Sequence, residues 1–99
     1  MIPVSRGSDL QLASAAITIT HNVHKLSNTQ NGGLTLDTIN VPSPDFHGLL
    51  VLFTEELHAT DDSIQLGDNG NIVGTKLLHP NEGVLLYYDS ANNLFHVIA

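Results

Sequence analysis

The C-terminal stretch GVLLYYDSANNLFHVI, residues 83–98, decides the fold class of this 99-residue chain. It holds two apolar runs, residues 83–88 and 94–98, with the length and the branched or aromatic side chains that are typical of β-strands. The five residues between them, DSANN, are turn formers, and their number suits a hairpin connection. The end of the chain is therefore predicted to form a β-hairpin.

A period of two also marks the rest of the chain. AITIT at 16–20 alternates apolar residues with threonine, and LTLDTI at 34–39 alternates similarly but slips out of phase near its end. The run GLLVLFT at 48–54 is almost continuously apolar, which predicts a strand buried on both faces. Shorter candidate strands lie at residues 10–13, 23–26, 64–66, 72–73 and 76–78.

Signals for helices are weak. TEELHA at 54–59 has the length of one turn, with Thr54 as a possible N-cap, but six residues do not sustain an amphipathic helix. Pro42 and Pro44 break the chain between strands. We therefore expect an all-β fold, a compact antiparallel β-sandwich or β-barrel with short hairpins and an extended N-terminal arm. Residues 15–99 are expected to form this single domain, and residues 1–14 an arm that stays flexible until it is bound.

The chain is acidic and poor in charge. Lys and Arg number three against ten Asp and Glu, which gives a formal net charge of −7, and charged residues make up only 13%. Three scattered cations do not neutralise a row of phosphates, so binding to nucleic acid or to an anionic membrane is not expected. The absence of cysteine excludes disulfides and zinc–thiolate sites. The sequence lacks a signal-peptide pattern and an apolar run of about 18 residues, so we expect a soluble cytoplasmic product.

The segment IQLGDNGNIV, residues 64–73, raises the question of a calcium loop. Such a loop needs acidic or amide residues at its first, third and fifth positions. Counting from Asp68, the third position is Gly70 and the fifth is Ile72, so the pattern fails. Asn69 and Gly70 between two apolar runs are instead a hairpin signal, because both tolerate positive φ. We predict a turn.

Two sets of titratable residues are candidate sites. The acidic set could hold calcium or act as an acid–base pair, but we expect a solvated loop that carries the negative charge: Glu55, Glu56, Asp61 and Asp62. The six histidines are His21, His24, His47, His58, His79 and His96. The closest pair is three residues apart, which sends the rings to opposite faces of a strand, whereas a metal site on a strand favours His-x-His. We expect the histidines to support turns or subunit contacts, with a cluster on an oligomer axis as the alternative.

The sequence contains no recognisable catalytic motif. A nucleophilic serine needs a strained elbow such as Gly-x-Ser-x-Gly, and none is present. The Gly32-Gly33 pair is followed by a predicted strand rather than by a helix, so it does not form a phosphate loop. We therefore expect a protein that is not an enzyme and that has no catalytic residues, no metal and no cofactor.

The succession of strands resembles the small β-rich virion proteins of tailed bacteriophages, most closely the capsid decoration (cement) proteins. The likeness covers residues 16–99 and is carried by short strands rich in threonine and asparagine, tight Gly and Asn turns, and a closing hairpin. The segments that show it are residues 17–24, 32–39, 48–53, 64–73 and 84–98. The chain begins at Met1 and is short, so we expect a stand-alone cement protein rather than a module of a long fibre.

The resemblance implies a structural role in the virion. Such proteins commonly form homotrimers on the outer surface of the capsid, where they bridge subunits of the major capsid protein and stabilise the head. The N-terminal arm is the candidate partner-binding segment, through Ile2, Val4, Leu10 and Leu12. A frayed terminus or a first strand is the alternative for the same residues.

A tail-fibre or receptor- and glycan-binding module is the alternative function. Such a site uses exposed aromatic side chains beside loop Asn or Asp, for which Tyr87, Tyr88 and Asp89 are the candidates. The three phenylalanines are expected in the core: Phe46, Phe53 and Phe95.

Overall fold

The computed structural model describes residues 5–12, 14–28, 34–43, 45–57 and 62–99. Over these residues the chain forms strands and no helix, so the predicted all-β fold is confirmed and the helical turn at 54–57 is not formed. No helix in the described part has the length and apolarity of a membrane span. The strands are β1 (Leu10–Leu12), β2 (Ala16–Thr18), β3 (Val23–Asn28), β4 (Leu34–Leu36), β5 (Thr38–Asn40), β6 (Gly48–Phe53), β7 (Ile64–Leu66), β8 (Ile72–Val73), β9 (Lys76–Leu78), β10 (Gly83–Asp89) and β11 (Leu94–Val97).

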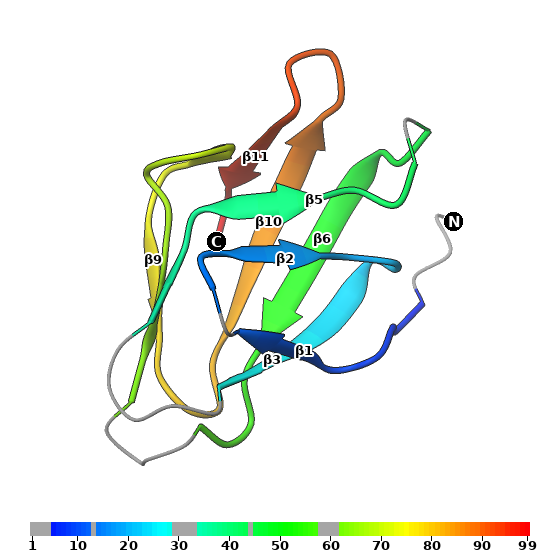
Figure 1. The fold of residues 1–99 in the computed structure, drawn as a ribbon. Coiled ribbons are helices and arrows are strands. Elements are labelled where there is room, and N and C mark those ends of the chain that lie inside the picture. The colour runs from blue at the N-terminus through cyan, green and yellow to red at the C-terminus, as the bar shows by residue number, and fades with distance from the viewer. Residues whose placement is uncertain (1–4, 13, 29–33, 44, 58–61) are drawn as a thin grey trace.

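The strands form a six-stranded sheet and a facing layer. The large sheet has the order β1-β3-β6-β10-β11-β8, and the facing layer contains the pair β2-β5 and the three strands β4-β7-β9. Figure 1 shows β2 and β5 crossing in front of β6 and β10, as expected of a sandwich. The predicted closing hairpin is confirmed by β10 and β11, which pair antiparallel with Tyr87 opposite His96.

Among the described residues, five of the eight strand pairings are parallel, which corrects the expectation of an antiparallel architecture. β1, β3 and β6 lie parallel in the large sheet, β2 is parallel to β5, and β4 is parallel to β7. The chain from β1 to β7 therefore winds around the core in turns, each adding strands beside those of the turn before, as in a short β-solenoid. A parallel pair needs a crossover connection, and here strands of the facing layer supply it instead of helices.

The core lies between the two layers and is built from alternate strand residues. In β6 and β10 every second side chain points inward, so the burial pattern has the period of two that a sheet imposes. The fully or nearly fully buried apolar residues are Leu12, Ile17, Ile19, Leu26, Leu36, Ile39, Leu50, Leu52, Ile64, Leu66, Ile72, Leu78, Val84, Leu86, Tyr88 and Phe95.

The phase slip in residues 34–39 marks a corner. Leu36 and Ile39 are both buried, although three residues apart they would point to opposite faces of one continuous strand. The chain bends at Asp37, and the N–H groups of Asp37 and Thr38 both donate to the carbonyl oxygen of Ala15 (2.9 and 3.1 Å). The bend separates β4, which pairs with β7, from β5, which pairs with β2.

The N-terminal segment is a strand of the large sheet where it is described. β1 pairs in parallel with β3, Leu12 is fully buried in the core, and Leu10 packs against the core. Leu10 and Leu12 are thus not part of a free arm, because the domain's own sheet already pairs and covers them. The first-strand alternative is the one observed, and Ile2 and Val4 lie outside the described residues.

Candidate functional site

One face of the six-stranded sheet packs on the core, and the other lacks such a cover over the described residues. Leu50 and Leu52 of β6 point into the core, so Leu49 and Val51 between them point outward. Leu49 is 45% exposed. This corrects the expectation that the apolar run at 48–54 is buried on both faces, since within one chain β6 is covered on one face only.

The outward side chains form apolar rows across the strands. Tyr87 lies opposite Leu49 on one side and His96 on the other, and His96 is the register partner of Val73. Tyr87 is 49% exposed and Val73 39%.

A second row lies next to the first. Leu85 pairs with Val51, and Val51 is the register partner of Val23 in β3. The N–H of Ile98 donates to the carbonyl oxygen of Leu85 (2.9 Å), and Ile98 is 55% exposed. The two rows together define the outer sheet face: Val23, Leu49, Val51, Val73, Leu85, Tyr87, His96 and Ile98.

Charges at one corner of the outer sheet face compensate one another. Arg6 lies over the ring of Phe53, 5.3 Å from its centroid, so Phe53 borders the outer sheet face and is not in the core as expected. Arg6 also contacts the Asp9 carboxylate (3.1 Å), and the Lys25 ammonium lies 3.4 Å from Asp9 and 3.7 Å from Glu55. These ion pairs are exposed and contribute little stability, but they leave the corner close to neutral.

Asp89 stands at the other end of β10. The side-chain amide of Asn92 donates to its carboxylate (2.8 Å), and so does the N–H of Ala91 (3.2 Å). These hydrogen bonds, the one from Asn92 first, hold the pKa of Asp89 below its ordinary value. The carboxylate therefore closes the turn between β10 and β11.

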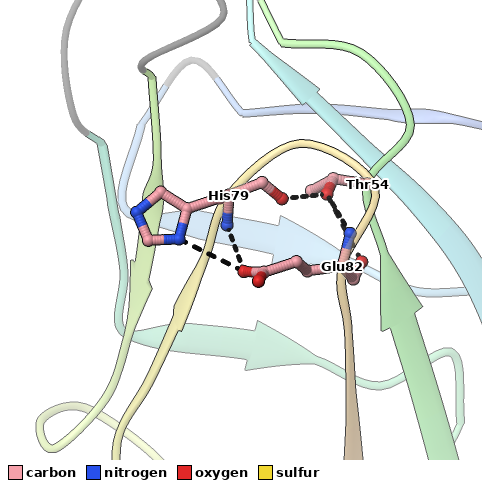
Figure 2. Close-up of polar contacts among 3 residues, drawn as sticks. All are labelled: Thr54, His79 and Glu82. Atoms are coloured by element: carbon pink, nitrogen blue, oxygen red, sulfur yellow. Dashed lines mark hydrogen bonds and ion pairs between the residues drawn. The ribbon is translucent and has the colours of Figure 1, made fainter.

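A hydroxyl, an imidazole and a carboxylate meet at one end of the sandwich, in Thr54, His79 and Glu82 (Figure 2). The Thr54 hydroxyl donates to the carbonyl oxygen of His79 (2.5 Å) and accepts from the N–H of Glu82 (3.1 Å). The Glu82 carboxylate accepts from the His79 N–H (2.7 Å), and His79 Nδ1 lies 3.3 Å from the same oxygen.

This group fastens a loop and does not form a catalytic triad. The Thr54 side chain is bonded to main-chain groups and not to the His79 ring, so no base is placed to take its proton. The backbone N–H of His79, and then its ring, lower the pKa of Glu82. Thr54 thus joins the end of β6 to the connection between β9 and β10.

A shallow depression of about 220 Å³ adjoins this loop. It is lined by Glu55, Glu56, Leu57, Pro80 and Asn81. Glu55 and Glu56 are exposed, as predicted for a solvated loop. No group of residues in the described part has the arrangement of a metal site, so the depression contains acidic groups but no ligand set.

Asp62 departs from the prediction for the acidic set. It is buried and accepts a hydrogen bond from the side-chain amide of Asn28 at the end of β3 (3.1 Å). A buried carboxylate needs such donors, and the sequence offered no sign of the Asn28 partner, which is 34 residues away. Asp61 lies outside the described residues.

The segment at 67–71 forms the predicted turn but not a hairpin. Gly67 and Gly70 have φ of 64° and 58°, and the N–H of Ile72 donates to the carbonyl oxygen of Asn69 (3.1 Å). The flanking strands do not pair with each other, because β7 pairs with β4 and β9 while β8 pairs with β11. A Cβ at Gly70 would overlap the carbonyl oxygen of Asp37, so the turn packs closely on the corner between β4 and β5.

Asn71 follows this turn and acts as a strand partner. Its side chain accepts from the N–H of Ile39 and donates to the carbonyl oxygen of Ile39, both at 2.8 Å. Its own carbonyl oxygen accepts from the N–H of Phe95 (2.8 Å). Asn71 therefore ties β5 to β11 across the sandwich.

His24 is a structural histidine. Its ring is fully buried, and Nε2 accepts from the N–H groups of Thr20 (2.9 Å) and His21 (3.0 Å). Nδ1 lies 2.7 Å from the carbonyl oxygen of Ser8, so the proton is on Nδ1. His24 therefore supports a turn, as predicted, and fixes Gly7, where a Cβ would overlap the ring.

The candidate glycan-binding residues are not brought together. Tyr87 is on the outer sheet face, while Tyr88 points into the core and donates its hydroxyl to Asn93 (2.9 Å). Tyr88 packs between Phe95 (4.5 Å between ring centroids) and Phe46 (5.7 Å), which places those two phenylalanines in or against the core as expected.

Sequence reasoning missed the outer sheet face, Thr54 as a loop fastener and Asn71. The sequence did contain a signal for the outer sheet face. The run of β6 is apolar at both sets of alternate positions, and only one set can face the core of its own chain. Comparisons of the chain with known protein families, with curated proteins and with solved structures find no match.

Proposed function

We propose that this chain is a structural virion protein, a capsid decoration (cement) protein that binds the major capsid protein on the outer surface of a tailed-phage head and stabilises the shell. The resemblance of the strand pattern to decoration proteins suggests that the assembly in which this chain takes part is a capsid. The described residues offer an exposed apolar surface on which such a contact can form.

The outer sheet face is the observation that carries the proposal. β6 and β10 have the composition of strands that are covered on both faces. In this structure each of the two strands is covered on one face only, the one that packs on the core. Contiguous apolar surface of this kind marks a protein–protein contact. A chain with few charged residues is better suited to a large, permanent interface than to a free monomer in solution.

A shell-binding experiment tests the proposal. Purified protein is mixed with expanded phage heads that lack their decoration protein, and bound copies are measured by sedimentation and electron microscopy. We expect saturable binding, three copies per binding site as the resemblance implies, and a higher temperature of shell opening. Heads that bind none of the protein and open at an unchanged temperature would contradict the proposed function.

A further inference from the structure

We propose that Asn69 is a site of spontaneous chemical modification, at which the main-chain nitrogen of Gly70 displaces the side-chain amide and the chain gains a carboxylate. The inference is independent of the proposed function, since the reaction needs water and no partner. Three features of the structure lead to it: the contact between the two residues, their exposure, and the way in which other asparagines are held.

The reacting groups of Asn69 and Gly70 are already in contact. The N–H of Gly70 donates to Oδ1 of Asn69 (2.9 Å), so the nitrogen lies beside the amide carbon Cγ to which that oxygen is bonded. Groups that are held together in this way react without first having to find each other. Gly70 has no Cβ that would shield its nitrogen, and both residues are exposed, so water reaches the amide.

The reaction at Asn69 has two steps. The Gly70 nitrogen forms a bond to Cγ of Asn69, the bond from Cγ to Nδ2 breaks, and Nδ2 leaves as ammonia together with the proton of the Gly70 N–H. The intermediate is a cyclic imide, a succinimide. Water then opens the ring at either of its carbonyl carbons, which leaves aspartate or isoaspartate at this position. In both cases a neutral side chain becomes negatively charged.

Two other asparagines are held in ways that oppose the same reaction. Asn81 is also exposed, but the N–H of the next residue, Glu82, donates to the Thr54 hydroxyl (3.1 Å) and is not free to attack. The side-chain amide of Asn71 is bonded to both backbone groups of Ile39, at 2.8 Å each, and a β-branched residue follows it. These two asparagines are therefore internal controls within the same chain.

The modification is expected to loosen the turn in which it occurs. A Cβ on Gly70 would overlap the carbonyl oxygen of Asp37, and the N–H of Asn71 donates to the same oxygen (3.1 Å), so the turn packs closely on its neighbour. Isoaspartate lengthens the main chain by one carbon atom at this point. The new carboxylate also follows Asp68 directly, in a chain that is already acidic. The isoaspartyl protein should therefore be less stable than the unmodified protein.

Peptide mapping by mass spectrometry follows the reaction. The folded protein is kept at physiological temperature in buffers from neutral to mildly alkaline pH, beside a sample unfolded in guanidinium chloride. Fragment ions assign each conversion to its residue and separate Asn69 from Asn31, which also precedes a glycine but lies outside the described residues. A protein isoaspartyl methyltransferase detects the isoaspartyl product. Asn69→Ser, which has no amide, is the control variant.

In the folded protein we expect Asn69 to lose its amide at least about tenfold faster than Asn71 or Asn81, because its contact with the attacking nitrogen is already made. The rate should rise with pH, since the Gly70 N–H gives up its proton. Unfolding should not accelerate the reaction at Asn69, but it should accelerate the reaction at Asn81, where it releases the N–H of Glu82. Isoaspartyl protein, separated by ion exchange, should unfold at a lower denaturant concentration than Asn69→Ser.

Either of two outcomes would overturn the inference: a conversion of Asn69 that is slower in the folded protein than in the unfolded chain, or conversion of Asn71 and Asn81 at the same rate as Asn69. The first would show that the fold protects the amide, and the second that the contact with Gly70 has no effect. An isoaspartyl protein as stable as Asn69→Ser would overturn the expected loosening of the turn. None of these results depends on whether the protein binds phage heads.

Discussion

Thr54→Val removes the hydroxyl that joins β6 to the connection between β9 and β10 and keeps the shape of the side chain. Thr54 is only 2% exposed. Without its hydroxyl, the carbonyl oxygen of His79 and the N–H of Glu82 lose this hydrogen-bond partner. Each buried group left unpaired costs about 1–3 kcal/mol. His79 and Glu82 are exposed residues, so water reaches part of their backbone and the lower half of that range, about 1–2 kcal/mol for each group, applies. For the two groups together we expect a loss of about 2–4 kcal/mol in the free energy of unfolding.

Urea unfolding followed by circular dichroism measures this loss, and Thr54→Ser is the matched control. Serine keeps the hydroxyl and removes one methyl group, which costs about 1 kcal/mol. Two results would refute the reasoning: a Thr54→Val protein within about 0.5 kcal/mol of wild type, or equal losses in the two variants, which would assign the effect to packing instead of the hydrogen bonds.

Three further predictions concern the loops. Asn71→Ala should lower the free energy of unfolding by about 2–4 kcal/mol, because it leaves both backbone groups of Ile39 unpaired, and amide exchange at Ile39 should accelerate; an unchanged exchange rate would contradict this. Gly70→Ala should lower it by about 2–4 kcal/mol in urea, since φ is positive and the new Cβ overlaps Asp37; a loss no larger than that of Asn69→Ala would count against it. The pKa of Glu82 is lowered from 4.5, so its contribution to stability is present above pH 4.5 and is lost as the pH falls through the lowered pKa; Glu82→Gln should therefore flatten the acid side of the stability curve, and an identical acid limb would contradict the assignment.

The strands could be predicted because their signal is local. Each run with a period of two became a strand, and the phase slip at Asp37 became a bend between two strands that belong to different sheets. The alternation of apolar and polar residues is a property of one segment, so it predicts a strand regardless of which other strand the segment pairs with.

The parallel winding could not be predicted in the same way. Parallel strands here are connected through strands of the facing layer, and nothing local to β1 or β3 specifies that β3 and not β2 is the neighbour of β1. Register and neighbour choice depend on which apolar faces meet in the folded chain. The hairpin expected around Gly70 failed for this reason: the turn is local, but the pairing of β8 with β11 is not.

Side chains that form hydrogen bonds with backbone groups far away in the sequence could not be predicted either. Thr54 contacts residues 25 and 28 positions away, and Asn71 contacts Ile39 over 32 positions. Threonine and asparagine are common throughout the chain, so their types do not distinguish these two from the rest. The outer sheet face was missed differently, because an apolar run does not tell whether its second face is covered by its own chain or by another.

Hydroxyl-radical footprinting of tyrosine and leucine, read by mass spectrometry, tests most directly whether the outer sheet face is a contact surface. Tyr88, which is buried in the core, and Leu77, which is exposed on β9, are internal references for protection and for reactivity. In protein bound to phage heads we expect Tyr87 and Leu49 to be protected like Tyr88. In the free protein we expect both to react readily, as Leu77 does in both states. Equal oxidation of Tyr87 in the free and in the bound protein would contradict the account.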